Sequence, residues 1–155
     1  MPDSAAEEYW KKFLATLPDD SAYRQKTYSA EPFGDTPELA DQLAALVLRG
    51  IKTGTCSALW EWEAEGNPIP EVGAISITLN GAGEPVCILE TTEITIRRFG
   101  EVDEDFARSE GEGDLSLHHW REAHANFFSR VLPKIGMEFT DQMPLVCERF
   151  ILIYK

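Results

Sequence analysis

Residues 50–59 hold the side chains most able to do chemistry, a lysine and a hydroxyl in a glycine-rich setting. Lys52 follows the expected end of a helix, and Thr55 comes three residues later. Gly50 and Gly54 flank the lysine. A lysine amine can accept a proton, and an activated hydroxyl can act as a nucleophile. Residues three apart point to opposite faces of a regular strand, but a bulge at Gly54 could bring the two side chains together. The alternative is a solvated lysine beside an ordinary strand threonine.

Glu110 is the candidate carboxylate for the same site. It lies at the end of a short acidic helix predicted over residues 103–110, just before Gly111. The negative end of the helix dipole and the nearby acids Glu112 and Asp114 should raise its pKa, unless a cation such as Lys52 is close. A carboxylate placed against its local preference and followed by glycines suggests a functional role. The alternative is a solvated acidic loop.

Cations and aromatic side chains occur together in residues 21–35, which show no clear periodicity and predict an ordered loop. Arg24 and Tyr28 from this segment are candidate ligand-binding residues, with Gly54 and Trp60. Aromatic rings can stack on a nucleobase, and cations can neutralise a phosphate. The alternative is that the aromatic residues anchor the loop to the core while the cations are solvated.

Neither the histidines nor the three cysteines predict a metal site or a cofactor. His118 and His119 are adjacent on a predicted helix, so they point about 100° apart and make a poor chelate. His124 lies on the apolar face of the same helix, which indicates a hydrogen-bonded, partly buried residue more than a catalyst. The cysteines lack the spacing of a zinc site. We therefore expect no structural metal.

Clear end signals predict the helix that precedes Lys52. Thr36 is the expected N-cap, Pro37 takes the first helical position, and Gly50 is the expected left-handed residue after the helix. Lys52 should therefore leave the helix at a fixed point. Other helices are predicted over residues 5–17 and from residue 115 to residue 132, the latter with Asp114 as its N-cap.

Alternating residues predict strands over residues 75–79, 86–97 and 145–154, with a hairpin signal at residues 80–83. The segment from residue 60 to residue 73 is expected to lead into a loop. Helices with several antiparallel strands indicate an α+β fold, with a small β-barrel or a curled, mostly antiparallel sheet and helices packed around it. We expect one domain over residues 1–155, in which residues 1–35 form an N-terminal helical extension and loop.

Composition limits the classes of function. The 155 residues are 43% hydrophobic, and 14 basic against 27 acidic residues give a formal charge of -13. This balance disfavours a broad surface for polyanions and favours a small ligand. We expect no membrane span and no obligate protein partner. An odd number of scattered cysteines, without a signal-like segment, predicts a cytoplasmic protein.

Taken together, the motifs resemble those of the ASCH-domain family, relatives of the RNA-associated PUA-like barrels, and within it the longer bacterial type. The resemblance spans most of the chain and rests on Gly50-x-Lys52-x-x-Thr55, Pro70-Glu71-Val72-Gly73, Glu110-Gly111-Glu112-Gly113-Asp114, Leu117-x-x-Trp120-x-x-x-His124-x-x-Phe127-Phe128 and Glu148-Arg149-Phe150.

The resemblance implies a PUA-like barrel with a cleft around Lys52 that binds a nucleoside or short RNA. Short bacterial members deacylate N4-acetylcytidine with a lysine, a threonine and a glutamate, which Lys52, Thr55 and Glu110 match. Thr55 would then attack the amide, and Lys52 would take its proton. Glu110, with a raised pKa, would relay a proton to the leaving amine or position the base. The alternatives are a ribonuclease, to which other longer members have been linked, and a non-catalytic RNA-binding module.

Overall fold

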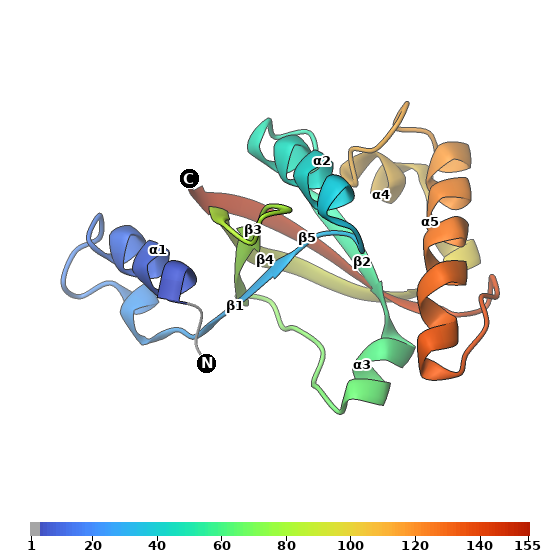
Figure 1. Ribbon diagram of the computed structural model, residues 1–155, viewed down its shortest axis with the longest axis horizontal. Coiled ribbons are helices and arrows are strands. Elements are labelled where there is room, and N and C mark those ends of the chain that lie inside the picture. Colours follow the sequence, from blue (N-terminus) through green and yellow to red (C-terminus); the bar gives the residue numbers. More distant parts are fainter. Residues whose placement is uncertain (1–3) are drawn as a thin grey trace.

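The computed structural model describes residues 4–155, which form one mixed sheet with helices packed around it (Figure 1). The helices are α1 (Ser4–Leu14), α2 (Pro37–Leu48), α3 (Leu59–Glu65), α4 (Glu104–Ser109) and α5 (Leu117–Val131). The strands are β1 (Tyr28–Pro32), β2 (Gly54–Ala58), β3 (Ile75–Leu79), β4 (Pro85–Arg98) and β5 (Pro144–Tyr154). Three short 3-10 helices are η1 (Ala22–Gln25), η2 (Phe99–Glu101) and η3 (Leu132–Ile135).

The five strands are ordered β1-β3-β4-β5-β2, and only the β1–β3 pair is parallel. The long strands β4 and β5 shift register twice, between Ile88 and Leu89 and between Thr91 and Glu93. Such irregularities bend a strand and increase its twist. The sheet therefore curls into a half-barrel, and the predicted α+β fold with a curled, mostly antiparallel sheet is confirmed.

Three hydrophobic clusters hold the helices on the sheet. Figure 1 shows α1 at one end of the molecule and α5 at the other, with α2 between them. The cluster beneath α5 includes Phe106, Trp120, Phe128 and Leu145; the one beneath α1 includes Trp10, Phe13, Ile77 and Ile88; the third contains Val47, Cys87, Leu89 and Phe150. Because α1 contributes to a cluster with β3 and β4, it is packed against the sheet.

Helix α2 begins and ends where the sequence predicts. The hydroxyl of Thr36 accepts a hydrogen bond from the Leu39 amide at 3.1 Å, and Gly50 is left-handed with φ 74°. Beyond it, the amide of Lys52 donates to the carbonyl of Leu46 at 3.1 Å. The turn after α2 thus fixes the point from which the Lys52 side chain enters the protein.

Helix α1 is shorter than predicted, ending at Leu14 instead of residue 17. The amide of Leu17 bonds the Leu14 carbonyl, three residues back, so the last turn is not α-helical. The guanidinium of Arg24 donates to the carbonyls of Leu14, Pro18 and Leu17 at 2.8–2.9 Å. Those contacts satisfy the free carbonyls at the helix end, which is a tertiary effect that periodicity does not reveal.

Strand β1 and helix α3 are among the elements that the sequence did not predict. Strand β1 lies within the segment expected to be a loop, and it pairs in parallel with β3, Tyr28 opposite Ile75. Helix α3 lies where the sequence predicts a segment that leads into a loop. Its N-cap residue, Ala58, makes no side-chain hydrogen bond to cap the helix. Only the left-handed Gly66 marks its end.

The start of α5 is also corrected. Ser116, not Asp114, caps the helix by accepting from the His119 amide at 3.1 Å. Asp114 instead accepts from the amide of Ser116 at 2.9 Å, which positions the capping residue.

Within residues 4–155 no helix is both long and apolar enough to cross a lipid bilayer. The assignment of residues 1–155 to a single domain, with residues 1–35 as an extension, stays a prediction.

Candidate active site

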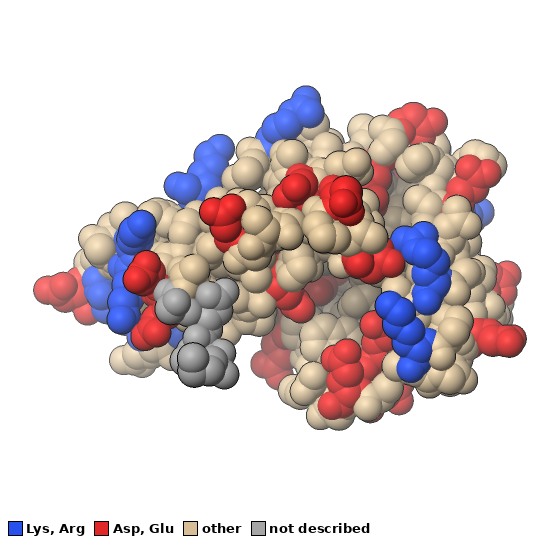
Figure 2. Space-filling model, viewed as in Figure 1, with Lys and Arg blue, Asp and Glu red and all other residues tan. Residues whose placement is uncertain are grey.

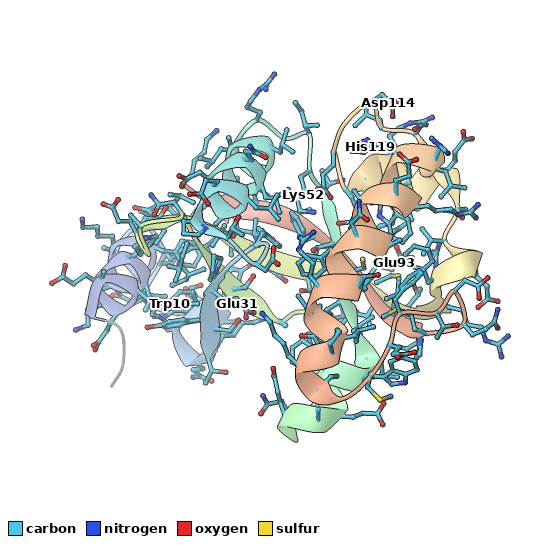
Figure 3. The ribbon with its side chains drawn as sticks, turned by 45° about the vertical axis from the view of Figure 1, so that its right-hand side comes forward. Trp10, Glu31, Lys52, Glu93, Asp114 and His119 are labelled. Carbon is cyan, nitrogen blue, oxygen red and sulfur yellow. The ribbon has the colours of Figure 1, made fainter. Side chains whose placement is uncertain are left out.

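Lys52 is fully buried and pairs with Glu110. Its side chain is 1% exposed, and its ammonium donates to Glu110 Oε1 at 2.9 Å and to the carbonyl oxygen of Gly54 at 2.9 Å. The ammonium also lies 5.2 Å from the centre of the Phe33 ring. In Figure 3 the labelled Lys52 lies between α2 and α5. Because burying an unpaired ammonium is very unfavourable, Glu110 is required for this placement.

The turn after α2, which carries Lys52, and the turn after α4, which carries Glu110, lie in close contact. Glu110 is the C-cap that follows α4, and the next residue, Gly111, is left-handed with φ 75°. A Cβ at Gly111 would lie 2.8 Å from the carbonyl oxygen of Ile51, closer than real Cβ atoms approach other heavy atoms. The amide of Thr53 donates to the Ser109 carbonyl at 2.7 Å across the same contact. Glycine at position 111 therefore lets the Lys52 turn and the Glu110 turn meet.

The second oxygen of Glu110 contacts α5. The indole N–H of Trp120 donates to Glu110 Oε2 at 2.8 Å, and His124 Nε2 lies 3.2 Å from the same oxygen. Burial by itself would raise the pKa of Glu110, but the charges and hydrogen bonds of Lys52 and His124 hold that pKa well below its ordinary value. The pKa of Glu110 was expected to rise unless a cation such as Lys52 is close, and the structure places Lys52 against it, so the pKa is lowered and not raised.

His124 is part of the site, which the sequence did not predict. Its Nδ1 is 2.9 Å from the Trp120 carbonyl oxygen, and its ring stacks on the Trp120 indole with centres 4.3 Å apart. Burial lowers the pKa of His124, but Glu110 and then Glu112, whose carboxylate is 3.7 Å away, raise it above its ordinary value. The expectation of a hydrogen-bonded, partly buried histidine is confirmed. Its contact with Glu110 depends on the docking of α5 and has no local signal.

Lys52 and Thr55 border one cavity of about 290 Å³. Phe33, Glu110 and His124 line it as well, between α2 and α5. Within residues 4–155 no hydrogen bond joins the Thr55 hydroxyl to Lys52 or Glu110, so the three side chains share a cavity while only two are in contact. Gly54 contributes its backbone carbonyl to the lysine.

A larger cavity of about 520 Å³ adjoins the first. The two share Phe33, Gly34, Thr55 and Cys56. The residues lining the larger one include four glutamates and no lysine, arginine or histidine; the glutamates are Glu31, Glu61, Glu65 and Glu148. Figure 2 shows acidic side chains around a hollow in the middle of this face, with cationic side chains beside it. This cavity repels anions.

None of the four candidate ligand-binding residues, Arg24, Tyr28, Gly54 and Trp60, is among the residues that line the two cavities. The Arg24 guanidinium is bonded to backbone carbonyls beyond α1, Tyr28 packs on Trp10 with ring centres 5.0 Å apart, and Trp60 packs against the cluster beneath α5. Instead, Phe33 contacts Lys52, and Trp62 lines the larger cavity. A role for Arg24, Tyr28 or Trp60 in binding stays a prediction.

Comparisons with known proteins agree with the fold and the motifs. The sequence pattern of the ASCH domain matches residues 29–154. An ASCH-domain structure from Lactobacillus crispatus JV V101 is 36% identical, with a TM-score of 0.93, covering 99% of this chain and 96% of that one. Protein EF3133 from Enterococcus faecalis V583 is 32% identical, with a TM-score of 0.86, covering 97% and 89%. The chain matches no protein among those with curated functions.

Proposed function

This protein belongs to the ASCH-domain family, whose members in general bind RNA, and we propose that it binds a nucleoside in the cavity around Lys52 and hydrolyses an amide of that ligand. N4-acetylcytidine, in which an acyl group is attached to the exocyclic amine of the base, is the proposed substrate. The protein would act in the cytoplasm.

The buried ion pair between Lys52 and Glu110, in the wall of a cavity that Thr55 also lines, is the observation that carries this proposal. Removing two charges from water costs several kcal/mol per ion, so a buried pair is weak evidence for stability. Strongly shifted ionisable groups inside a cavity are instead typical of functional sites. A hydroxyl next to such a pair has the chemistry of acyl transfer.

The size and lining of the cavities support a neutral nucleoside. Ligand sites commonly measure about 300–1,000 Å³, and volumes of about 290 and 520 Å³ meet at a shared wall. The Phe33 ring in that wall offers a surface on which a base can stack. The glutamates of the larger cavity would repel a phosphate backbone, which supports a nucleoside over a polynucleotide and disfavours a ribonuclease.

The contacts of Lys52 modify the roles inferred from the sequence. A lysine paired with a carboxylate is suited to donate hydrogen bonds, and two of its three N–H groups reach Glu110 and Gly54. We assign the third to the amide carbonyl oxygen, where negative charge develops. Glu110 then holds the lysine in position.

Thr55 supplies the nucleophile in this proposal. Its oxygen forms a bond to the acyl carbon, the C–N bond breaks, and the hydroxyl proton ends on the departing amine. Water then cleaves the threonine ester, releasing the carboxylic acid and restoring the hydroxyl.

Incubation with N4-acetylcytidine tests the proposal, with cytidine release followed by chromatography. We expect the wild type to turn over and Thr55→Ala to lose at least about a hundredfold in rate, because the nucleophile is absent. Thr53→Ala is the matched control, since Thr53 is exposed and two residues away, and it should retain activity. If the wild type shows no turnover, or if wild type and Thr55→Ala turn over equally, the proposed hydrolase activity is contradicted.

Non-catalytic binding of short RNA is the second candidate, favoured by membership of the family. Binding of a short single strand should then weaken steeply with added salt and persist in Thr55→Ala. Undetectable or salt-independent binding excludes it.

A further inference from the structure

Three side chains with metal-binding atoms meet in the wall of the smaller cavity. Cys56 on β2, Glu110 after α4 and His124 on α5 place a sulfur, a carboxylate oxygen and a ring nitrogen within 4.8 Å of one another. We propose that this cluster binds a divalent transition-metal ion of the zinc class. A tetrahedral Zn²⁺ with bonds of about 2.0–2.3 Å holds its ligand atoms roughly 3.3–3.8 Å apart. Small side-chain movements would therefore close the cluster around an ion.

The contacts of His124 orient its ring so that Nε2 is available to bind a metal ion. Its Nδ1 lies 2.9 Å from the Trp120 carbonyl, so that nitrogen carries the donated hydrogen and Nε2 faces Glu110 at 3.2 Å. Metal-binding histidines are usually held this way, with the far nitrogen bonded to a carbonyl or carboxylate. The stacked indole of Trp120 further fixes the plane of the ring.

The Glu110 carboxylate can bind the ion without giving up Lys52. Lys52 uses Oε1, whereas Oε2 accepts from Trp120 and faces His124. A metal ion bonded to Oε2 and His124 Nε2 would lie between these two atoms, which are 3.2 Å apart. Glu112, with its carboxylate 3.7 Å from Nε2, is the nearest additional donor.

Acidic groups surround this buried position and would pair with a cation. Glu110 lies in the wall of the cavity, and the carboxylate of Glu112 lies 3.7 Å from His124 Nε2. Because a buried charge is unfavourable unless it is paired, these carboxylates and the Cys56 sulfur would offset the charge of a divalent ion.

The donor set also selects among metals. A thiolate sulfur and an imidazole nitrogen favour Zn²⁺ and Co²⁺, whereas Mg²⁺ and Ca²⁺ prefer oxygen ligands. These ligands come from positions 56, 110 and 124. Their spacing explains why neither the cysteines nor the adjacent histidines predict the site from sequence.

Titration of the full chain with Co²⁺ tests the proposal by absorbance, without any substrate. We expect one equivalent to give a thiolate-to-cobalt charge-transfer band and the visible bands of tetrahedral cobalt, which Zn²⁺ removes and Mg²⁺ does not. Cys56→Ser should abolish the thiolate band and weaken binding at least about tenfold. Cys87→Ser, on a buried cysteine outside the cluster, should keep the wild-type spectrum.

A second variant keeps the test decisive if Cys56→Ser fails to fold. His124→Gln should retain the fold, by circular dichroism, and bind Co²⁺ at least about tenfold more weakly. A wild type without a thiolate band, a band that survives Cys56→Ser, or unchanged affinity in His124→Gln would overturn the site. The metal test measures absorbance without substrate, whereas the hydrolase test measures cytidine release. A negative result in one test therefore leaves the other proposal standing.

Discussion

Glu110 receives contacts from three separate parts of the chain. Lys52 reaches one carboxylate oxygen from the turn after α2, while Trp120 and His124 reach the other from α5. The carboxylate is buried, and its hydrogen bonds offset part of the cost of removing it from water. Removing one partner of the Lys52–Glu110 pair should therefore destabilise the protein more than replacing both partners with apolar residues.

We predict that Lys52→Met destabilises the protein by about 3–5 kcal/mol, because it leaves the Glu110 charge buried without its ammonium partner. The double variant Lys52→Met with Glu110→Leu should be less destabilised than Lys52→Met alone, since the buried Glu110 charge is removed together with its ammonium partner. Urea unfolding of the wild type, both single variants and the double variant measures the coupling.

The exposed pair of Glu7 and Lys11, 3.4 Å apart on α1, is the matched control. Lys11→Met should change the free energy of unfolding by less than about 1 kcal/mol. Equal effects for Lys11→Met and Lys52→Met would contradict the importance of burial.

At this scale the sequence identifies some groups and misses others. Glu110 stands out because it conflicts with its local setting, and Lys52 because it follows a helix end beside two glycines and a hydroxyl. The structure brings the two side chains together across 58 positions. Trp120 and His124 lie on the apolar face of a predicted helix, which indicates core residues, and Cys56 belongs to a set of cysteines without the spacing of a metal site. Their contact with the carboxylate exists only once α5 is docked, so no local pattern contains it.

Elements with chemical signals at both ends are predicted well, as α2 shows through Thr36 and Gly50. Elements that depend on a distant partner are not. Strand β1 is ordered by parallel pairing with β3, and α3 begins without a side-chain cap. The curled sheet was predictable from alternation, whereas its two register shifts were not.

The contact between the α2 turn and the α4 turn yields a prediction at the element scale. Gly50 and Gly111 have nearly equal φ, 74° and 75°, but only a Cβ at Gly111 would meet another segment, the Ile51 backbone. Gly50→Ala should therefore cost only the left-handed backbone term of about 1–2 kcal/mol. Gly111→Ala should cost more and separate Lys52 from Glu110.

Urea unfolding measures both glycine variants, and cytidine release reports the state of the site. If Gly111→Ala and Gly50→Ala are equally stable, the close approach of the two turns is not required. Both substitutions carry the same cost of a left-handed backbone, so the difference between their free energies of unfolding isolates the cost of the contact with Ile51.

Across the whole molecule, the formal charge of -13 is the dominant long-range feature. Like charges on a compact body repel, and salt screens that repulsion over a Debye length of about 10 Å at 0.1 M. We predict that Tm rises with added NaCl, by roughly 2–4 °C for each kcal/mol gained. A thermal melt series in NaCl measures it.

Glu63→Gln is the control for this effect, since Glu63 is exposed on α3 and the change removes one negative charge. Its Tm should rise less with salt than that of the wild type. A Tm that falls as salt is added would show that exposed ion pairs outweigh the repulsion.

The place of β2 at the edge of the sheet has a consequence for biosynthesis. This strand carries Thr55 and Cys56, and within the sheet it pairs only with β5, near the C-terminus. Until the ribosome has made β5, β2 has no strand to join in the sheet, and until it has made Glu110, Lys52 has no carboxylate partner. The wall of the smaller cavity is thus completed only after β5 has been synthesised, and a nascent chain that stops before β5 would carry its hydroxyl and thiol on an unpaired strand.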